Sequence, residues 1–320
     1  MDIGIVGTNF ISEWFVAACR AGSGRVRPTA VCSRDAARGA EFAARSDLPR
    51  SFTTVEEMCE AVDAVYIASP TSAHHPQAMA AIEAGRHVLI EKEMAASAAE
   101  AEEIFAAAER RGVVAMEAAR HLHTPAFREF RRAIGDIGTV RYAHFEMLQY
   151  SSRYGRFLAG EHVNAFDPTL GNAAIVDIGF YPLSAALECF GTAPASQSGG
   201  SYWLHNGFEG GGSIQLGYEG LLVDVAYSKI VSAVGATTVH GEEGTLTVNA
   251  VAEPSRVELH RRGQDPVVLV DTPPVTPADT MIHELDVFAD QVDAGRVDPH
   301  WRDISLAVRR IMDAHLASVR

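Results

Sequence analysis

The sequence predicts an α/β protein that begins with a doubly wound parallel sheet and continues into an α+β domain with an open, mostly antiparallel sheet. In residues 1–120, short apolar runs alternate with helical patterns of about ten to fifteen residues, which is typical of βαβ units. In residues 196–271, β segments are separated by glycines, which is typical of strands joined by short turns. Because the alternation stops near residue 120, we expect two domains, 1–120 and 121–320, packed closely together.

Each element of the first part has its own signal. Short continuous apolar runs are typical of strands buried on both faces, and Asp35, Thr54 and Ser97 are residues that cap helix N-termini. Glu57 and Glu100 stand three residues after two of these caps, as in a capping box. The expected strands are 3–6, 28–32, 62–68, 87–90 and 113–116, and the expected helices are 11–21, one after Asp35, one after Thr54, 75–84 and 97–110.

The second part shows a different order of elements. Pro125 stands at the favoured first position of a helix that we expect to end near residue 134. A long strand over 140–148 and a helix after Asp177 follow. The remaining expected strands are 196–204, 212–218, 221–230, 236–240, 244–249, 255–261 and 266–271, and the last two helices are 280–293 and 302–318.

Size and composition exclude several classes of protein. The chain has 320 residues, 47% hydrophobic and 21% charged, which is an ordinary globular mixture with enough length for a core. Lys and Arg number 27 against 41 Asp and Glu, and the resulting charge of −14 disfavours a nucleic-acid partner. No apolar run approaches the ~18 residues of a membrane helix, and the first residues do not resemble a signal peptide. We therefore expect a cytoplasmic protein with no membrane partner.

Cysteine and histidine spacing argues against a metal site. The four cysteines form no C-x-x-C pair and lie in apolar neighbourhoods, so we expect reduced, packed thiols; they are Cys19, Cys32, Cys59 and Cys189. The pairs His74-His75 and His121-x-His123 lack the spacing of zinc ligands. The sequence also lacks a G-x-S-x-G motif for a serine nucleophile.

The segment after the first strand is a candidate phosphate-binding turn. Ligands of parallel sheets bind beyond the carboxyl ends of the strands. The residues there are Gly7, Thr8, Asn9, Phe10, Ile11 and Ser12. Only the first glycine of G-x-G-x-x-G is present, and Asn9 tolerates left-handed backbone better than most residues. The N-terminus of the following helix offers N–H groups to a phosphate, although an ordinary strand–helix turn explains the pattern equally well.

Three further loops at this edge are candidates for a dinucleotide site. An acidic residue after the second strand would pair with the ribose of NAD, whereas Ser33 and Arg34 suit the 2′-phosphate of NADP; the alternative is a solvated Arg. After the third expected strand, backbone and hydroxyl groups can line a cofactor; the candidates are Ser69, Pro70, Thr71 and His74. Glu91 and Lys92 follow the next strand, where the lysine is either a surface cation or a group that favours a nearby deprotonated oxygen.

Asp177 and Tyr181 stand four residues apart at an expected helix start, so they share one face. The simple alternatives are an N-cap for Asp177 and a half-buried aromatic with a satisfied hydroxyl for Tyr181.

These landmarks together resemble the Gfo/Idh/MocA family of oxidoreductases, especially its dihydrodiol dehydrogenase and glucose–fructose oxidoreductase branch. The resemblance covers nearly the whole chain. The matching segments are Gly4-Ile5-Val6-Gly7-Thr8, Ser33-Arg34, Tyr66-Ile67-Ala68-Ser69-Pro70, Ala84-Gly85-Arg86-His87-Val88 with Glu91-Lys92, and Asp177-Ile178-Gly179-Phe180-Tyr181-Pro182. The resemblance implies an N-terminal Rossmann domain that binds NADP, with NAD as an alternative, and a C-terminal substrate domain whose sheet forms a homodimer or higher homo-oligomer.

The resemblance also implies residue roles. Lys92 corresponds to the catalytic lysine of the family's E-K-P motif, Tyr181 to the acid/base of this branch, and Asp177 to an acid lining the same site. Further candidates for substrate contacts are Arg120, His121, Tyr154 and His162. The sequence departs from the family pattern at Glu93, where proline is expected, and at Asn9, where the second glycine is expected.

The implied function is hydride transfer between a nicotinamide and a sugar, polyol, dihydrodiol or related carbonyl compound, because the nicotinamide carries the hydride and the protein manages the proton. Two alternatives keep the fold: an NADP-binding regulatory protein without turnover, and a glycosidase that regenerates its nicotinamide in each cycle. The retention of Lys92, Asp177 and Tyr181 favours the dehydrogenase or reductase.

Overall fold

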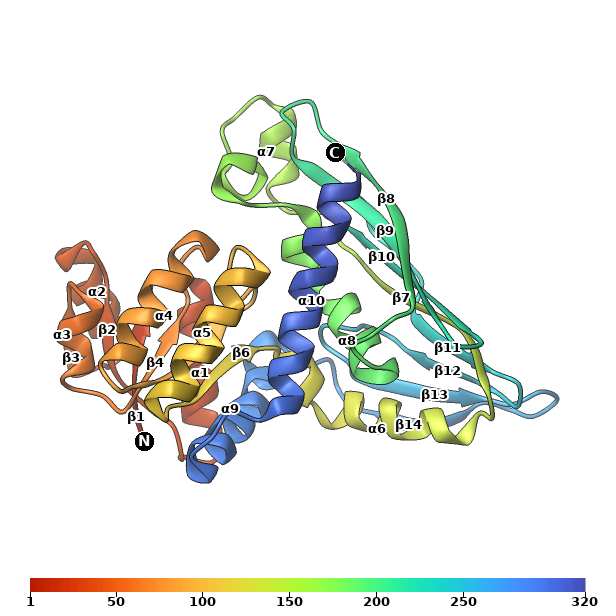
Figure 1. Cartoon of the computed structure of the whole chain (residues 1–320), viewed down its shortest axis with the longest axis horizontal. Coiled ribbons are helices and arrows are strands. Elements are labelled where there is room, and N and C mark those ends of the chain that lie inside the picture. The colour runs from red at the N-terminus through yellow and green to blue at the C-terminus, as the bar shows by residue number, and fades with distance from the viewer. Residues whose placement is uncertain (320) are drawn as a thin grey trace. The chain divides into compact units, whose positions relative to one another are not determined.

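The computed structural model describes residues 1–319, which form two compact units (Figure 1). The first unit comprises Met1–Arg120 and Thr276–Leu306, and the second comprises His121–Val275 and the residues from Ala307 onward. A six-stranded sheet lies in the first unit and an eight-stranded sheet in the second, so the predicted fold class is confirmed.

The six-stranded sheet is parallel throughout and has the order β3-β2-β1-β4-β5-β6. Its strands are β1 Asp2–Val6, β2 Arg27–Cys32, β3 Arg50–Phe52, β4 Ala64–Ile67, β5 His87–Glu91 and β6 Ala115–Ala118. The strand β3 was not predicted, because three residues at a sheet edge carry no apolar run. The last strand begins at Ala115 rather than at the predicted residue 113.

Helices cover both faces of this sheet, as the doubly wound pattern requires. They are α1 Phe10–Ala21, α2 Ala36–Arg45, α3 Val55–Cys59, α4 His74–Glu83, α5 Ala98–Arg111 and α9 Pro277–Ala294. Alternate residues of each strand enter different cores: Val65 and Ile67 pack against α3, α4 and α5, whereas Tyr66 packs against α1 and α9. The predicted caps Asp35, Thr54 and Ser97 each accept a backbone N–H three residues on.

One segment that the sequence analysis assigned to the second domain packs with the first. Residues 276–306 carry α9, which buries Met281, Leu285 and Phe288 in one core with Phe15 of α1. The spacing of apolar residues in α9 indicates that one face of the helix is buried, but it does not indicate which sheet that face packs against. The chain therefore returns to its first unit before α10, Pro299–Ser318, leads back to the second.

The second unit is built on the eight-stranded sheet, in the order β14-β13-β12-β11-β7-β10-β9-β8. Only β7 and β10 pair in parallel, so the sheet is mostly antiparallel, as predicted. The strands are β7 Val140–Leu148, β8 Ser196–Trp203, β9 Glu209–Tyr218, β10 Leu221–Ser228, β11 Thr237–Gly241, β12 Thr245–Val248, β13 Arg256–His260 and β14 Val267–Asp271.

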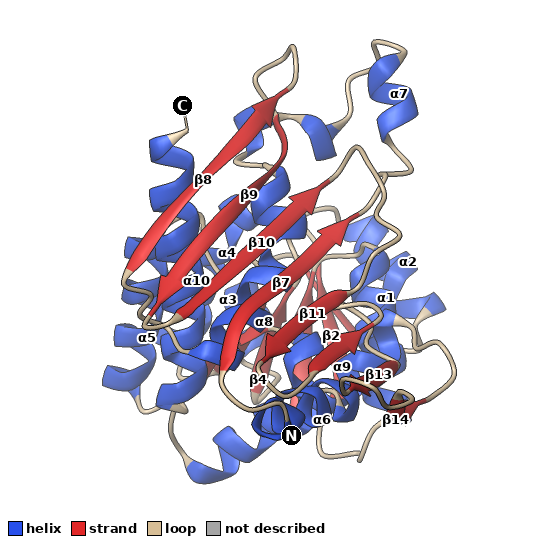
Figure 2. Ribbon diagram, turned by 90° about the vertical axis from the view of Figure 1, so that its right-hand side faces the viewer, coloured by secondary structure: helices blue, strands red, loops and turns tan. Residues whose placement is uncertain are grey.

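Two helices of the second unit, α6 Pro125–Ala133 and α8 Phe180–Phe190, pack on one face of its sheet. The helix α7, Tyr154–Leu158, was not predicted and lies beyond the ends of β7 and β10 (Figure 2). Phe130 of α6 and Phe190 of α8 both contact Phe145 of β7 edge to face. Among the described residues, no helix crosses the face of the sheet that Figure 2 turns to the viewer.

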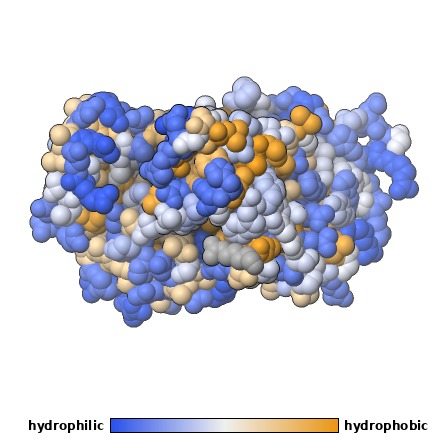
Figure 3. All heavy atoms as spheres, turned by 90° about the horizontal axis from the view of Figure 1, so that it is seen from above, coloured by the Kyte–Doolittle hydropathy of each residue, from blue (hydrophilic) through white to orange (hydrophobic). Residues whose placement is uncertain are grey.

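None of the helices within residues 1–319 is both long and apolar enough to cross a membrane. Figure 3 shows a face on which hydrophilic side chains predominate and apolar side chains occupy smaller areas between them.

Candidate functional site

The turn after β1 depends on the glycine at position 7. Gly7 has φ of +114°, a backbone conformation that L side chains rarely adopt. A Cβ atom there would lie 2.8 Å from the carbonyl oxygen of Ala68, at the end of β4. The Gly7 N–H also donates to the carbonyl of Cys32 at 3.1 Å. These contacts hold the backbone between two neighbouring strands and leave no room for a side chain.

The departure at Asn9 has a local explanation that differs from the predicted one. Asn9 has φ of −92°, so it does not use the left-handed conformation; it is the N-cap of α1. Its Oδ1 accepts the Ser12 N–H at 3.1 Å, and its Nδ2 donates to the carbonyl of Ala68 at 2.8 Å. The N–H groups of the first helical turn, starting at Phe10 and Ile11, lie outside the helical ladder, as at any helix N-terminus.

Ser33 and Arg34 follow β2 at the same edge of the sheet. The Ser33 N–H donates to the carbonyl of Phe52 in β3 at 3.0 Å, and Arg34 is exposed. The unpredicted strand β3 therefore fixes the backbone on which the cationic side chain stands.

His74 connects two of the predicted loops. Its Nδ1 lies 2.8 Å from the carbonyl oxygen of Glu93, and its Nε2 lies 2.8 Å from that of Ser69. Burial lowers the pKa of His74, which favours the neutral imidazole. The side chain is buried between the loops after β4 and β5, so it holds them together rather than facing a ligand. Pro70 and Thr71 stand at the start of a short 3-10 turn in the first of these loops.

The strand β5 ends at Glu91, and Lys92 follows it. Glu91 accepts a hydrogen bond from the hydroxyl of Tyr66, and burial raises the pKa of its carboxyl group. Lys92 is half-buried, and the peptide bond between it and the buried Glu93 is cis. The next residue, Met94, donates its N–H to Glu117 Oε1 of β6 at 2.7 Å. The loop that carries Lys92 is thus bonded to the neighbouring strand.

A buried carboxyl group on α9 lies in the field of Glu91. Burial and then the charge of Glu91 raise the pKa of Glu284 well above its ordinary value, while the charge of Arg120 opposes this. Glu284 is fully buried, and neither of its carboxyl oxygens has a hydrogen-bond partner among residues 1–319. Arg120 donates to Thr280 Oγ1 of the same helix at 2.6 Å. Sequence reasoning did not identify Glu284, because α9 is far from β5 along the chain.

In the second unit, Asp177 lies within a π-helical turn, Ile175–Gly179, that leads directly into α8. It is therefore not an N-cap. The Lys229 ammonium group lies 2.8 Å from Asp177 Oδ2. Glu209 of β9 holds the start of the turn, because its Oε2 accepts the Ile175 N–H at 2.9 Å and its Oε1 accepts the Ser201 hydroxyl at 3.0 Å. No motif marks Lys229, which directly follows β10, or Glu209 of β9, since both are distant in sequence from Asp177.

Tyr181 is the second residue of α8, and His121 contacts both its carbonyl group and its ring. His121 Nε2 lies 3.1 Å from the Tyr181 carbonyl oxygen and 3.0 Å from Ser184 Oγ, and the two aromatic rings meet edge to face with centroids 5.0 Å apart. His121 is fully buried, so a direct substrate contact, as the sequence analysis expected, does not fit its environment.

The other three weaker candidates lie in different environments. Arg120 is buried against α9. Tyr154 belongs to α7 and stacks on Phe157 in an aromatic cluster with Phe166. His162 is exposed, with its Nε2 2.9 Å from Asp167 Oδ2.

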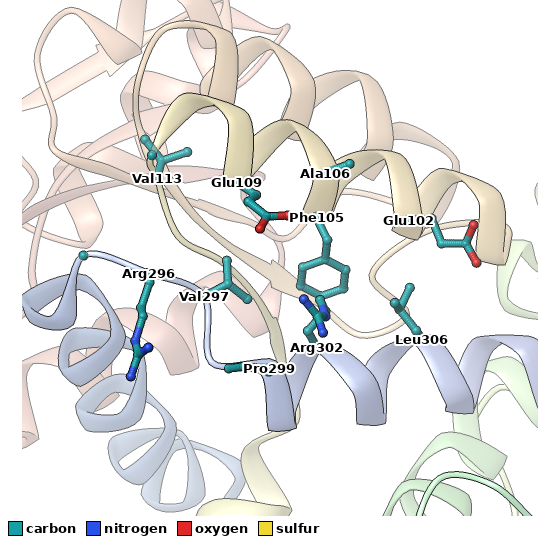
Figure 4. A pocket seen from close by; sticks show the side chains of 12 residues that line it. Glu102, Phe105, Ala106, Glu109, Val113, Arg296, Val297, Pro299, Arg302 and Leu306 are labelled. Carbon is teal, nitrogen blue, oxygen red and sulfur yellow. The ribbon is translucent and has the colours of Figure 1, made fainter.

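A groove of about 430 Å³ in the first unit is separate from all of these residues. Figure 4 shows Phe105 and Val113 facing Val297 and Leu306, with charged side chains around them. Val113 precedes β6, so the groove lies toward the amino ends of the strands, whereas ligands of such sheets bind at the carboxyl ends.

The carboxyl edge of the first sheet fits a dinucleotide. The turn at Gly7 carries no side chain, the capped start of α1 offers N–H groups and the positive end of its dipole to a phosphate, and an exposed arginine follows β2.

Comparison with known proteins identifies the family. Residues 1–119 match the model of an oxidoreductase family with an NAD-binding Rossmann fold, GFO_IDH_MocA, and residues 127–247 match the GFO/IDH/MocA C-terminal domain. The chain is 36% identical to scyllo-inositol 2-dehydrogenase (NADP(+)) IolU of Bacillus subtilis over 97% of its own length and 94% of that protein. It is 28% identical to trans-1,2-dihydrobenzene-1,2-diol dehydrogenase of Xenopus laevis over 77% of its length and 74% of that protein.

A solved structure has the same fold. A 3-ketoreductase from Actinomadura kijaniata, in complex with NADP and TDP-benzene, superposes with a TM-score of 0.85 at 24% identity, covering all of this chain and 98% of that one. These matches confirm the resemblance seen in the sequence. The chain belongs to the Gfo/Idh/MocA family and is an oxidoreductase with an NAD-binding Rossmann domain.

Proposed function

We propose that this enzyme transfers a hydride between NADP and a hydroxyl-bearing carbon of a cyclic polyol or sugar. One observation carries the proposal: the chain aligns over 97% of its length with an NADP-dependent scyllo-inositol 2-dehydrogenase. Its own sequence also contains Lys92 and the Asp177–Tyr181 segment, which resemble the family's motifs. The exposed Arg34 after β2 supports NADP over NAD, because an arginine there pairs with a 2′-phosphate.

The residues that would hold the cofactor belong to the first unit. The turn at Gly7, Thr8 and Asn9 and the N-terminus of α1 would bind the pyrophosphate, and Ser33 with Arg34 would bind the 2′-phosphate. The loops after β4 and β5, which His74 ties together, would complete the cradle.

The chemistry requires a proton to move when the hydride does. A bound nicotinamide supplies hydride transfer. Tyr181 would remove the proton from the substrate hydroxyl during oxidation and return it during reduction. Lys92 would stabilise the developing negative charge on oxygen, and Asp177 would accept a hydrogen bond from a second substrate hydroxyl.

Cofactor choice is the first test. The fluorescence of NADPH and NADH is followed as each is titrated into the protein. We expect NADPH to bind at least tenfold more tightly, and Arg34→Asp to remove most of that preference, because it replaces a charge-assisted contact by repulsion. Equal binding of both nucleotides by the wild-type protein would contradict the assignment of Ser33 and Arg34.

Turnover is the second test. NADPH formation is measured with scyllo-inositol, D-xylose and levoglucosan, and Tyr181→Phe and Lys92→Met should each lower kcat by about 100-fold or more. Release of free sugar from a glycoside with no net NADPH formation would favour the glycosidase alternative instead. Tight NADPH binding with no reaction in either assay would favour the regulatory alternative.

We also propose that the enzyme is a cytoplasmic homodimer that pairs through the open face of its eight-stranded sheet. Exposed Tyr142, Tyr202 and Leu222 on this sheet support an interface, and four free cysteines support a reducing compartment. Light scattering at micromolar concentration tests the pairing; a monomer mass would contradict it.

A further inference from the structure

The chain contains only two lysines, Lys92 and Lys229, among 27 Lys and Arg residues. The other 25 cationic side chains are arginines, so arginine is the ordinary cation of this protein. One lysine is the proposed charge-stabilising residue, and the other lies against Asp177. Lysine and arginine are interchangeable on most surfaces but not where a compact ammonium group is required.

The side chain of Lys229 is almost fully buried. Its ammonium group lies 2.8 Å from Asp177 Oδ2 and donates to the carbonyl oxygen of Ala165 at 2.9 Å. The rings of Phe166 and Phe208 face it with centroids at 5.1 and 5.4 Å. Only 5% of the lysine side chain is exposed. Two oxygen acceptors and two aromatic faces suit a point cation, whereas a planar guanidinium needs a wider, fork-shaped site.

The partner carboxylate is in a different environment. The Asp177 side chain is 48% exposed, so the ion pair has one buried cation and one half-exposed anion. Burying a cation without a counter-charge is costly, so Lys229 requires Asp177 to be ionised. Because the lysine is fixed by Ala165 and the two rings, it also fixes the orientation of the carboxylate.

We propose that Lys229 is a positioning residue that holds Asp177 ionised and oriented, so that the exposed part of the carboxylate accepts a hydrogen bond from a hydroxyl of a polyhydroxylated substrate. This inference rests on the proposed function. It assigns substrate recognition to Asp177 and the support of its carboxylate to Lys229, which the carbonyl of Ala165 in the 3-10 turn Asn164–Phe166 holds in turn.

The presence of only two lysines allows a direct test that does not need turnover. Protein labelled with 15N at the lysine side chain should give two ammonium resonances, which Lys92→Met and Lys229→Met assign. We expect Asp177→Asn to shift the Lys229 resonance and to speed its hydrogen exchange. Titration with scyllo-inositol, D-xylose or levoglucosan in the presence of NADP should shift the same resonance. A Lys229 signal that is unchanged by Asp177→Asn, or by all three compounds, overturns the proposal.

Kinetics test whether Lys229 acts through Asp177. We expect Lys229→Met to raise KM for scyllo-inositol by about 10- to 100-fold, with a smaller effect on kcat and none on the Kd of NADPH. The double variant with Asp177→Asn should bind substrate no worse than Asp177→Asn alone, within about threefold, because the lysine has lost the group that it positions. If the effects of the two substitutions on KM multiply in the double variant, Lys229 and Asp177 act independently and the proposal is overturned.

A simple folding defect gives a different result. Loss of structure in Lys229→Met would lower kcat and the melting temperature together, whereas Asp177→Asn keeps the lysine and provides an independent variant. The proposed function is tested separately by wild-type turnover. If wild-type protein oxidises none of the three compounds but the Lys229 resonance responds to one of them, the substrate site stands and the hydride-transfer assignment fails.

Discussion

The candidate site residues fall into two halves, one in each unit, and the two halves are built in different ways. At the carboxyl edge of the six-stranded sheet, backbone conformation shapes the first half: a glycine with positive φ, an Asn that caps α1 and a loop directly after β2. In the segment Ile175–Gly179 and the start of α8, distant side chains shape the second half, namely Glu209, Lys229 and His121.

This difference determines how each half responds to change. A site made of backbone N–H groups loses ligand affinity when a substitution prevents the chain from adopting the conformation that presents those groups. A site made of side chains loses ligand affinity when a residue that hydrogen-bonds to those side chains is removed, even if that residue does not touch the ligand. Variants in one half should therefore affect NADPH binding, and variants in the other should affect substrate.

The largest effect is expected at Gly7. In Gly7→Ala, the new Cβ meets the Ala68 carbonyl at 2.8 Å in a conformation with φ of +114°. We expect a loss of at least ~2 kcal/mol in the free energy of unfolding and a rise of more than tenfold in the Kd of NADPH. Urea denaturation and fluorescence titration measure the two quantities.

Gly24→Ala is the matched control. Gly24 also has positive φ, +78°, but a Cβ there meets nothing within 4 Å. It should cost about 1 kcal/mol and leave NADPH binding unchanged. Equal losses of NADPH affinity in both variants would show that the close contact with Ala68 is not what matters.

The next effect is expected at Glu209. Its buried carboxyl accepts from Ile175 and Ser201, and burial raises its pKa. Glu209→Leu should destabilise the protein by about 2 kcal/mol, because the two donors lose their acceptors. KM for scyllo-inositol should rise while the Kd of NADPH stays within twofold. A Glu209→Leu protein that changes only in NADPH binding would contradict the assignment of the two halves to different ligands.

Glu284 gives a pH-dependent effect within the first unit. The charged groups that act on its pKa are Glu91 and Arg120, and its own charge raises the pKa of Tyr66 and of Cys19. Because its folded-state pKa is raised, the folded protein holds this proton more tightly than the unfolded chain. The associated stability is complete below the ordinary carboxyl range and is lost as pH rises through the raised pKa.

Glu284→Gln removes this dependence. We expect the variant to match the wild type in urea denaturation at pH 4 and to be more stable by about 1–2 kcal/mol at pH 9. The exposed Glu60→Gln is the control and should show no such difference between the two pH values. A Glu284→Gln protein that is less stable than the wild type at pH 9 would contradict the raised pKa of Glu284.

The smallest effect is expected at Gly179, where π-helix passes into α8. A Cβ there would lie 3.1 Å from Tyr227 Cγ and 3.2 Å from Ile175 Cγ1, so both must move by a few tenths of an ångström. Gly179→Ala should cost about 1 kcal/mol and raise KM for scyllo-inositol modestly. Gly135→Ala, where a Cβ meets nothing within 4 Å, should be neutral in both measurements.

Much of the fold was predictable because its signals are local. The caps at Asp35, Thr54 and Ser97 are where they were predicted. The strands with continuous apolar runs are also present, with boundaries shifted by a few residues. The elements that were missed, β3 and α7, are three and five residues long, too short to show a period.

The candidate site was predictable to a smaller extent. The turn at Gly7 and the position of Arg34 follow from one segment each, and the structure gives both a physical reason. The alternative of Asp177 as an N-cap was wrong, because Asp177 lies inside a π-helical turn. Glu209 of β9, which is distant in sequence, holds the start of that turn through Ile175. His121 was expected at the substrate, but packing on Tyr181 buries it.

By itself, the sequence determined the α/β class, the alternation of strands and helices and the family resemblance, because each depends on residue types at short spacing. Tertiary structure alone decided that α9 joins the first unit, that Glu284 is buried in the field of Glu91, and that Lys229 holds Asp177. These contacts join residues distant in sequence, and which buried side chains meet depends on how helices and strands pack, which local pattern does not specify.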